Sequence, residues 1–424
     1  MNCSGQVENS LELALVSHAE TEHQHLHLRP LHDKATLIAF ASLAAWSWFV
    51  YSFGASLGIL REEQGTSPMI GGLHGTALAV GGILGALATP RLNQKFGRGL
   101  VMRISTAGVV VGILIFTIPG VTVVGTLVGA FIACFFGNPI VVCVNSFIVT
   151  HQGPASAPAL TESTALAALM GVLAPVFLGI SIASVLGWRA GSWAAVIAFV
   201  FIEIWRGRNL AVFGAPGEVR TRKESGALPR LTYWALTANM CYIGAEFCMS
   251  LWGVDLLREQ VGLSAAGAAA GLGALTAGIF VGRAFGAGIT RAVPAERLLK
   301  LSAVIGIVAF MIMWLATSAP VMLAAFFVTG VGVSLQWPLG MARILRSAGG
   351  RTDRAAGAAL AFGTAAIGGA PFVLGAMAER MPIHQAFLIV PVLLAASLGI
   401  VIFRPVPEAA AESATPAQAP AVSS

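Results

Sequence analysis

The sequence is short of charge. Asp, Glu, Lys and Arg together make up 10% of its 424 residues, against roughly 25% in ordinary soluble domains. Hydrophobic residues reach 56%, and the mean hydropathy is +0.81. A soluble domain does not need so much apolar surface, whereas a bilayer core about 30 Å thick demands about 20 apolar residues per helix. The composition therefore predicts an all-α protein that crosses a membrane several times.

Signatures of enzymes are missing as well. The sequence has no Walker loop, dinucleotide fingerprint or zinc-binding HExxH motif, so we expect neither nucleotide chemistry nor a cofactor. GASLG at 54–58 fits the Gly-x-Ser-x-Gly pattern of hydrolases, but that chemistry needs a strand-to-helix turn, and Ser56 falls in a predicted membrane helix. The five cysteines indicate no disulfide framework. We predict that the protein is not an enzyme.

Apolar runs bounded by charge, Pro or Gly predict twelve membrane spans. Of the 25 Lys and Arg residues, 21 fall on the same side as the N-terminus. Because cytoplasmic segments carry the excess of Lys and Arg, we expect both termini in the cytoplasm of a cell membrane, the inner one in a bacterium. This topology explains the net charge of +6 without nucleic acid. The predicted spans are 36–60, 69–89, 101–118, 121–149, 160–186, 190–206, 231–256, 264–290, 300–318, 320–342, 355–378 and 382–403.

An internal repeat divides these spans into two groups. A shift of 196 residues lays APVFLG at 174–179 on APFVLG at 370–375, and it also lays Lys95 on Arg291. One offset that holds from the first to the fifth span indicates duplication, so we predict two parallel six-helix halves. The predicted domains are a flexible tail at 1–33, an N-terminal half at 34–206, a basic linker at 207–230, a C-terminal half at 231–404 and a disordered tail at 405–424.

The first tail is rich in histidine. Residues 1–33 hold five of the eight His, as in HQHLHLRPLH. No Cys lies among them to complete a ligand set, which favours a flexible polar tail over a metal site. We predict no bound metal.

One loop carries a family resemblance. PRLNQKFGRG at 90–99 is similar to the motif Gly-x-Leu-x-Asp-Arg-x-Gly-Arg, which joins the second and third spans in the major facilitator superfamily. Pro90 and Gln94 depart from that motif, and GWR at 187–189 is another feature of the family. Over 34–404 the chain thus resembles a major facilitator transporter, which implies secondary active transport of a small solute by alternating access. The matching loop residues are Leu92, Lys95, Phe96, Gly97 and Arg98.

The loop also predicts a gate between the halves. Gly97 permits a tight turn, while Lys95 and Arg98 are placed to reach helix carbonyls or acidic groups on neighbouring helices. The alternative is that these cations only hold the loop in the cytosol. Glu162, near the start of the fifth span, either complements the helix N-terminus or contacts an Arg in the tenth span. The predicted gate residues are Lys95, Gly97, Arg98, Arg291, Glu162 and Arg343.

In the family, the first, fourth, seventh and tenth helices line the central pathway. Aromatic rings and amides on these helices suit a neutral sugar or polyol, or an aromatic drug-like compound, although each is also compatible with packing. GAE at 244–246 resembles a feature of fucose-permease-like facilitators and favours a neutral solute. The alternatives are a proton-coupled exporter of drugs or metabolites, and a solute sensor that does not transport. The predicted substrate contacts are Trp46, Trp48, Tyr51, Asn138, Asn145, Tyr242, Gln336 and Trp337.

YIGAEFCMSLW at 242–252 places one carboxylate in an apolar segment. Glu246 lies 15 residues after Leu231, about 22 Å along a helix and so well inside the core. No cation lies within one helical turn in sequence, so its partner comes from another helix, from water or from a proton. We predict that Glu246 couples transport to protons. We also expect a monomer whose partners are the solute, protons and the lipid bilayer. The alternative is a permanently protonated, hydrogen-bonded Glu246.

The other embedded charges have simpler interpretations. Helical spacing predicts ordinary pairs between Glu203 and Arg206 and between Asp255 and Arg258. Arg283 lies about two turns inside the eighth span, where a long side chain can snorkel to the interface.

Overall fold

The computed structural model describes residues 30–214 and 226–407, and every regular element in these ranges is helical. The predicted tails and part of the predicted linker, including most of the His-rich stretch, lie outside the described residues. The N-terminal half holds α2 (Lys34–Gln64), α3 (Pro68–Phe96), α4 (Arg98–Phe116), α5 (Val123–Gln152), α6 (Ser156–Ile182) and α7 (Arg189–Arg206), with the short helices η1 (Gly153–Ala155) and η2 (Ala211–Phe213).

The C-terminal half has more helices because three of its spans are broken. It holds α8 (Arg230–Val261), α9 (Ala265–Gly271), α10 (Gly273–Ala292), α11 (Ala295–Leu315), α12 (Ala319–Val333), α13 (Gln336–Ser347), α14 (Thr352–Ala378), α15 (Ile383–Ala386) and α16 (Ile389–Phe403). In the described residues, eleven helical stretches are long and apolar enough to cross a membrane. The remaining span, α7, is shorter and more charged, and it completes the predicted set of twelve.

Two of the breaks have a proline as their cause. Pro338 and Pro391 lie in the first turns of α13 and α16. A proline has no N–H for the carbonyl four residues earlier. The Ser334 carbonyl therefore accepts from the Arg283 side chain, and the Phe387 carbonyl accepts from the N–H of Val390, only three residues later. The tenth and twelfth spans therefore bend where the sequence analysis expected continuous helices. The second span also differs from the prediction, since α3 continues through Pro90 to Phe96.

Glycines bring neighbouring helices into close contact. A Cβ on Gly278 would lie 1.9 Å from the carbonyl oxygen of Phe327, and a Cβ on Gly85 would lie 2.0 Å from that of Phe135. Backbone packs against backbone at these sites, which only glycine allows. The second and eighth spans, which contain α3 and α10, therefore lie unusually close to their neighbours at these glycines.

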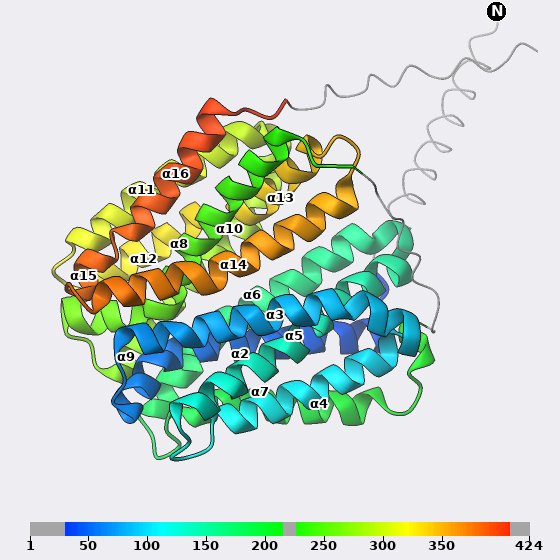
Figure 1. The fold of residues 1–424 in the computed structure, drawn as a ribbon, viewed down its shortest axis with the longest axis horizontal. Coiled ribbons are helices and arrows are strands. Elements are labelled where there is room, and N and C mark those ends of the chain that lie inside the picture. Colours follow the sequence, from blue (N-terminus) through cyan, green and yellow to red (C-terminus); the bar gives the residue numbers. More distant parts are fainter. Residues whose placement is uncertain (1–29, 215–225, 408–424) are drawn as a thin grey trace, which may run out of the picture.

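The two halves meet at one end of the bundle and diverge toward the other. We call the end that holds Gln64 and Val261 the distal end, and the end that holds Lys34 and Arg404 the terminal end. Figure 1 shows α3 and α14 close together at the distal end, on the left, and spread apart toward the terminal end. Thr76 of α3 donates a hydrogen bond to the Gly368 carbonyl of α14 over 3.2 Å.

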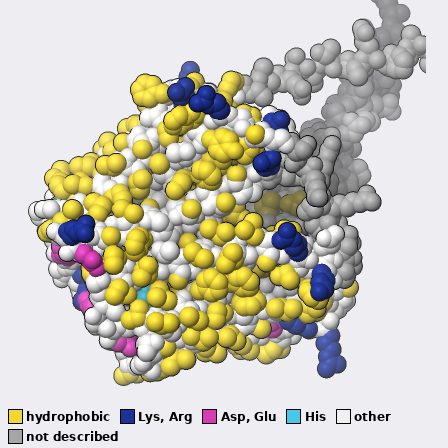
Figure 2. All heavy atoms as spheres, viewed as in Figure 1, with side chains coloured by type: hydrophobic (Ala, Val, Ile, Leu, Met, Phe, Trp, Pro, Cys, Tyr) yellow, Lys and Arg dark blue, Asp and Glu magenta, His cyan; other side chains and the backbone are white. Residues whose placement is uncertain are grey.

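The exterior fits a bilayer. Hydrophobic side chains cover most of the face in Figure 2, whereas Lys and Arg gather near its margins. Large apolar residues such as Phe201 and Ile204 are more than 60% exposed on α7, which in water would be an aggregation hazard. The chain is a multi-pass membrane protein.

Orientation in the membrane is open to a direct test. We expect a reporter fused at residue 187, in the distal loop before α7, to be external, and one fused at residue 215, just outside the described residues, to be cytosolic. The reason is the asymmetry of Lys and Arg between the two sides. Alkaline phosphatase activity at 187 and its absence at 215 provide the measurement. The opposite pattern would invert the predicted topology.

Candidate functional site

Glu246 lies near the middle of α8 and is 9% exposed. Tyr242, one helical turn earlier, donates a hydrogen bond from its hydroxyl to the Glu246 carboxylate. Residues four apart lie on the same helix face, so the sequence itself places this pair together. The predicted buried carboxylate is therefore present, and it has a hydrogen-bond donor on its own helix.

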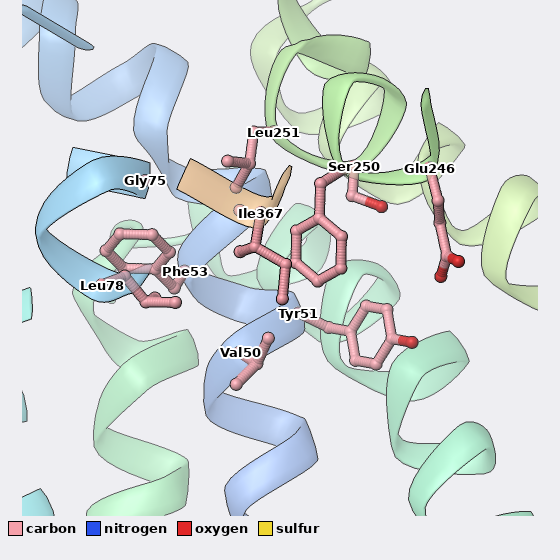
Figure 3. A pocket seen from close by; sticks show the side chains of 11 residues that line it. Val50, Tyr51, Phe53, Gly75, Leu78, Glu246, Ser250, Leu251 and Ile367 are labelled. Atoms are coloured by element: carbon pink, nitrogen blue, oxygen red, sulfur yellow. The ribbon is translucent and has the colours of Figure 1, made fainter. Parts of the chain in front are cut away.

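A cavity of about 270 Å³ opens beside this carboxylate. It takes one residue from the N-terminal half, Tyr51 of α2, and the rest from α8, α10, α13 and α14. Figure 3 shows the neighbouring small void, with the Tyr51 hydroxyl and the Glu246 carboxylate turned to the same side. The cavity is lined by Tyr51, Ile243, Glu246, Phe247, Arg283, Trp337, Leu360, Gly363, Thr364 and Ile367.

Arg283 of α10 is the cationic member of this site, and sequence reasoning missed it. Its guanidinium interacts electrostatically with Glu246 and with both Tyr242 and Tyr51. Its Nε donates a hydrogen bond of 3.2 Å to the Ser334 carbonyl. That carbonyl is free because Pro338 breaks the helix, so a proline in α13 fixes an arginine of α10. Arg283 thus faces the cavity, and the snorkelling predicted for it is wrong.

The predicted substrate contacts divide into two groups. Tyr51 and Trp337 line the cavity, and Tyr242 binds Glu246 beside it. The other five lie elsewhere. Trp46 packs on Gly137, Trp48 donates to the Gly191 carbonyl of α7 over 2.8 Å, Asn138 packs on Gly82, Asn145 is exposed on α5, and Gln336 is buried beside Asn239 and Arg343.

The loop between α3 and α4 has the predicted turn. Gly97 adopts a positive φ of 78° and separates the two helices, a conformation that glycine adopts without strain. Arg98 is buried and donates a hydrogen bond of 2.8 Å to Thr150 of α5, a contact inside the N-terminal half. Lys95 is exposed, with its ammonium over the Phe96 ring. The side chain of Arg291 lies outside the described residues.

The predicted contact between Glu162 and Arg343 is not formed in this state. The Glu162 carboxylate lies 2.7 Å from Nε2 of His32, an exposed residue just before α2. Arg343 is buried and donates over 2.9 Å to Glu296 of α11 and also to the Arg404 carbonyl. Each residue bonds within its own half, in a state in which the halves are spread apart at the terminal end.

Charged residues join the halves at the distal end instead. Arg61 of α2 binds Asp255 of α8 over 2.5 Å, and Arg258 of α8 binds Glu62 of α2 over 2.5 Å. Gly58 leaves room for the Asp255 carboxylate, since a Cβ there would lie 2.9 Å from its Oδ2. The predicted pair of Asp255 with Arg258 along one helix is therefore wrong. The predicted pair of Glu203 with Arg206 is confirmed at 2.8 Å.

Solved structures similar to this chain are membrane transporters. The Escherichia coli fucose:proton symporter matches with 21% identity and a TM-score of 0.56, over 87% of this chain and 99% of that one. A D-xylose-proton symporter matches with 14% identity and a TM-score of 0.69, over 88% and 98%. A POT family transporter in complex with 5-aminolevulinic acid matches with 11% identity and a TM-score of 0.73, over 88% and 96%. This chain has the major facilitator fold.

No protein-family model matches the chain, and no curated protein matches it. The fold nevertheless accounts for the position of the site. In this major facilitator fold, α2, α5, α8 and the α12–α13 pair are the first, fourth, seventh and tenth spans. The cavity draws on three of them and also on α10 and α14, which the resemblance did not include.

Proposed function

We propose that the protein is a proton-coupled secondary transporter that moves a small solute across a cell membrane by alternating access. The observation that carries the proposal is the buried Glu246, which lines a cavity between two halves that ion pairs join at the distal end. An ionised carboxylate in the membrane core is costly, so such a residue marks ion or substrate pathways.

The proton acts on the contact between the halves. Glu246 belongs to the C-terminal half, while Tyr51 of the N-terminal half interacts with it across the cavity. Uptake or release of a proton by Glu246 changes the charge that Tyr51 faces. Protonation therefore biases the equilibrium between the two arrangements of the halves, as coupling requires.

Tyr51, Trp337 and Tyr242 are the substrate contacts that we retain from the sequence analysis. Trp337 and Tyr51 offer rings with polar tips to the solute, and Tyr242 orients Glu246. A neutral sugar-like solute fits the rings. A neutral solute does not need a positive charge in its binding site, yet Arg283 places one in the cavity. The sequence analysis did not place Arg283 there.

Proton movement in proteoliposomes tests this function. Vesicles loaded with the pH dye pyranine are exposed in turn to two neutral sugars, L-fucose and D-xylose, and to one carboxylate, mandelate. No ion gradient is imposed. We expect at least one solute to shift the internal pH, because solute and proton move together. Solute counterflow with no pH change would contradict the coupling. Binding with neither counterflow nor pH change would indicate a sensor.

A further inference from the structure

Two charged side chains of opposite sign line the cavity. Among the described residues that line it, Glu246 and Arg283 are the charged ones, and they attract each other. Arginine stays protonated in proteins. The pair is therefore neutral only while the Glu246 carboxylate is ionised.

Protonation of Glu246 leaves the site with one unpaired positive charge. A buried, uncompensated charge is strongly unfavourable, and more so in the membrane core than near water. The charge belongs to Arg283, whose Nε is held by the Ser334 carbonyl, so the guanidinium is fixed at the cavity wall. An anion that enters together with the proton restores neutrality at this wall.

We propose that the cavity binds a small monocarboxylate with an apolar body, whose carboxylate binds Arg283 and takes over from ionised Glu246 as its counter-charge. This inference rests on the proposed proton-coupled transport and names its substrate class. One proton is taken up by Glu246 and one monoanion by Arg283, so the net charge of the cavity is the same before and after binding. The planar guanidinium suits a carboxylate because both form two parallel hydrogen bonds.

The rest of the wall selects an apolar body. Ile243, Phe247, Leu360 and Ile367 are apolar, and Trp337 adds an aromatic ring. A water occupies about 30 Å³ in the liquid, so the cavity of about 270 Å³ has the volume of about nine waters, which suits a ligand of roughly ten non-hydrogen atoms. An aromatic monocarboxylate of this size buries its ring on the apolar wall and places its charge on Arg283.

This exchange links binding to pH. The titratable and charged groups that face Glu246 are Tyr51 from α2, Tyr242 from α8 and Arg283 from α10, while α13 and α14 contribute Trp337 and Thr364, which do not titrate. Both tyrosines and the arginine keep their protons near neutral pH. One proton is therefore taken up per anion bound, and it goes to Glu246. The affinity for a monocarboxylate rises by up to about tenfold for each unit that the pH falls.

Binding of mandelate, compared with its neutral analogue mandelamide, tests the inference on the purified full-length protein. Titration calorimetry is run between about pH 5.5 and about pH 7.5, where the carboxylate of mandelate stays ionised. We expect mandelate to bind more tightly at the lower pH and mandelamide to show no such trend. Arg283→Gln should weaken mandelate binding by at least about tenfold, since it removes a charged hydrogen-bond donor. Arg283→Lys, which keeps the charge, should restore part of the affinity.

Arg103→Gln is the matched control, because Arg103 pairs with Glu203 at the terminal end and lies outside the cavity. It should leave mandelate affinity unchanged. Glu246→Gln should bind mandelate with an affinity independent of pH. The double variant Arg283→Gln/Glu246→Gln keeps the cavity neutral, so it should fold as the wild type does and still not bind mandelate, which separates ligand loss from unfolding.

The outcomes distinguish this inference from the proposed function. Proton-coupled uptake of L-fucose or D-xylose, with mandelate bound no better by wild type than by Arg283→Gln, would overturn the carboxylate site and leave the transporter standing. Mandelate binding that depends on Arg283, together with vesicles that move neither solute nor protons, would support the carboxylate site and overturn the proposed transport.

Discussion

Replacing Glu246 by glutamine is expected to abolish accumulation of solute driven by a pH gradient and to leave solute exchange intact. Glutamine has nearly the shape of the protonated acid and accepts the hydrogen bond that Tyr242 donates, but it neither takes up nor releases a proton. Solute exchange requires only that the solute-loaded protein changes conformation, which the variant still does. It carries no proton, so a pH gradient no longer drives accumulation. Proteoliposomes with an imposed pH gradient measure accumulation of labelled mandelate, or of L-fucose if mandelate does not bind, and counterflow measures exchange.

Glu203→Gln provides the control for this experiment. Glu203 is a half-buried carboxylate of a membrane helix, but it pairs with Arg103 and Arg206 at the terminal end of α7. Its neutralisation should leave the dependence of accumulation on the pH gradient unchanged. Accumulation by Glu246→Gln with the pH dependence of the wild type would exclude Glu246 as the coupling residue.

Local spacing explains what the sequence predicted well. The twelve spans follow from apolar runs of membrane length, and the Tyr242–Glu246 pair follows from the helical period. The Gly97 turn and the glycine contacts of α3 and α10 have the same origin, because each depends on residues a few positions apart or on one special residue. Features encoded within one or two turns are visible in the sequence.

Contacts between distant segments were the part that the sequence did not determine. Arg61 and Asp255 are 194 residues apart, and a helix neighbour such as Arg258 is the simpler partner when only spacing is known. Trp46 is aromatic and central in α2, yet it packs on Gly137 because that glycine leaves room for the ring. Which face of a helix turns to the cavity depends on its neighbours, and one sequence does not give their positions.

A proline in the tenth span could have predicted the position of Arg283. Pro338 follows the apolar α12 by five residues and frees the Ser334 carbonyl, which marks a helix break inside the membrane. Broken helices line binding sites in transporters, since backbone polar groups are tolerated at that depth only near protein or water. A cation in the nearby eighth span, such as Arg283, is then a candidate partner for that carbonyl rather than a residue that snorkels to the interface.

Neutralising Asp255 should open the distal end of the molecule. The Asp255 side chain is 7% exposed and the Arg61 side chain is 21% exposed, and the bond joins α2 of one half to α8 of the other. Asp255→Asn leaves the half-buried Arg61 without the Asp255 carboxylate whenever the distal end is closed. Loss of one partner from a buried ion pair costs about 3 kcal/mol at the lower end of measured values, or about a hundredfold in the equilibrium constant. The state that solvates Arg61 is the one with the distal end open.

Spin labels at Val124 of α5 and Leu315 of α11 report this change, because both are exposed at the distal ends of opposite halves. Double electron–electron resonance should show one main distance between the two labels in the wild type and a longer one in Asp255→Asn. Arg189→Gln is the matched control, since it breaks the bond to Glu63 at the same end but within the N-terminal half, and it should leave the distance unchanged.

The double variant Arg61→Gln/Asp255→Asn separates opening from loss of structure. It removes both charges, so no uncompensated guanidinium remains at the closed interface, and replacing a whole buried pair costs far less than breaking one. We therefore expect the double variant to return toward the shorter distance while Asp255→Asn does not. A long distance in both variants would show that the attraction itself holds the distal end closed. A short distance in both would mean that this ion pair has no influence on the position of the two halves.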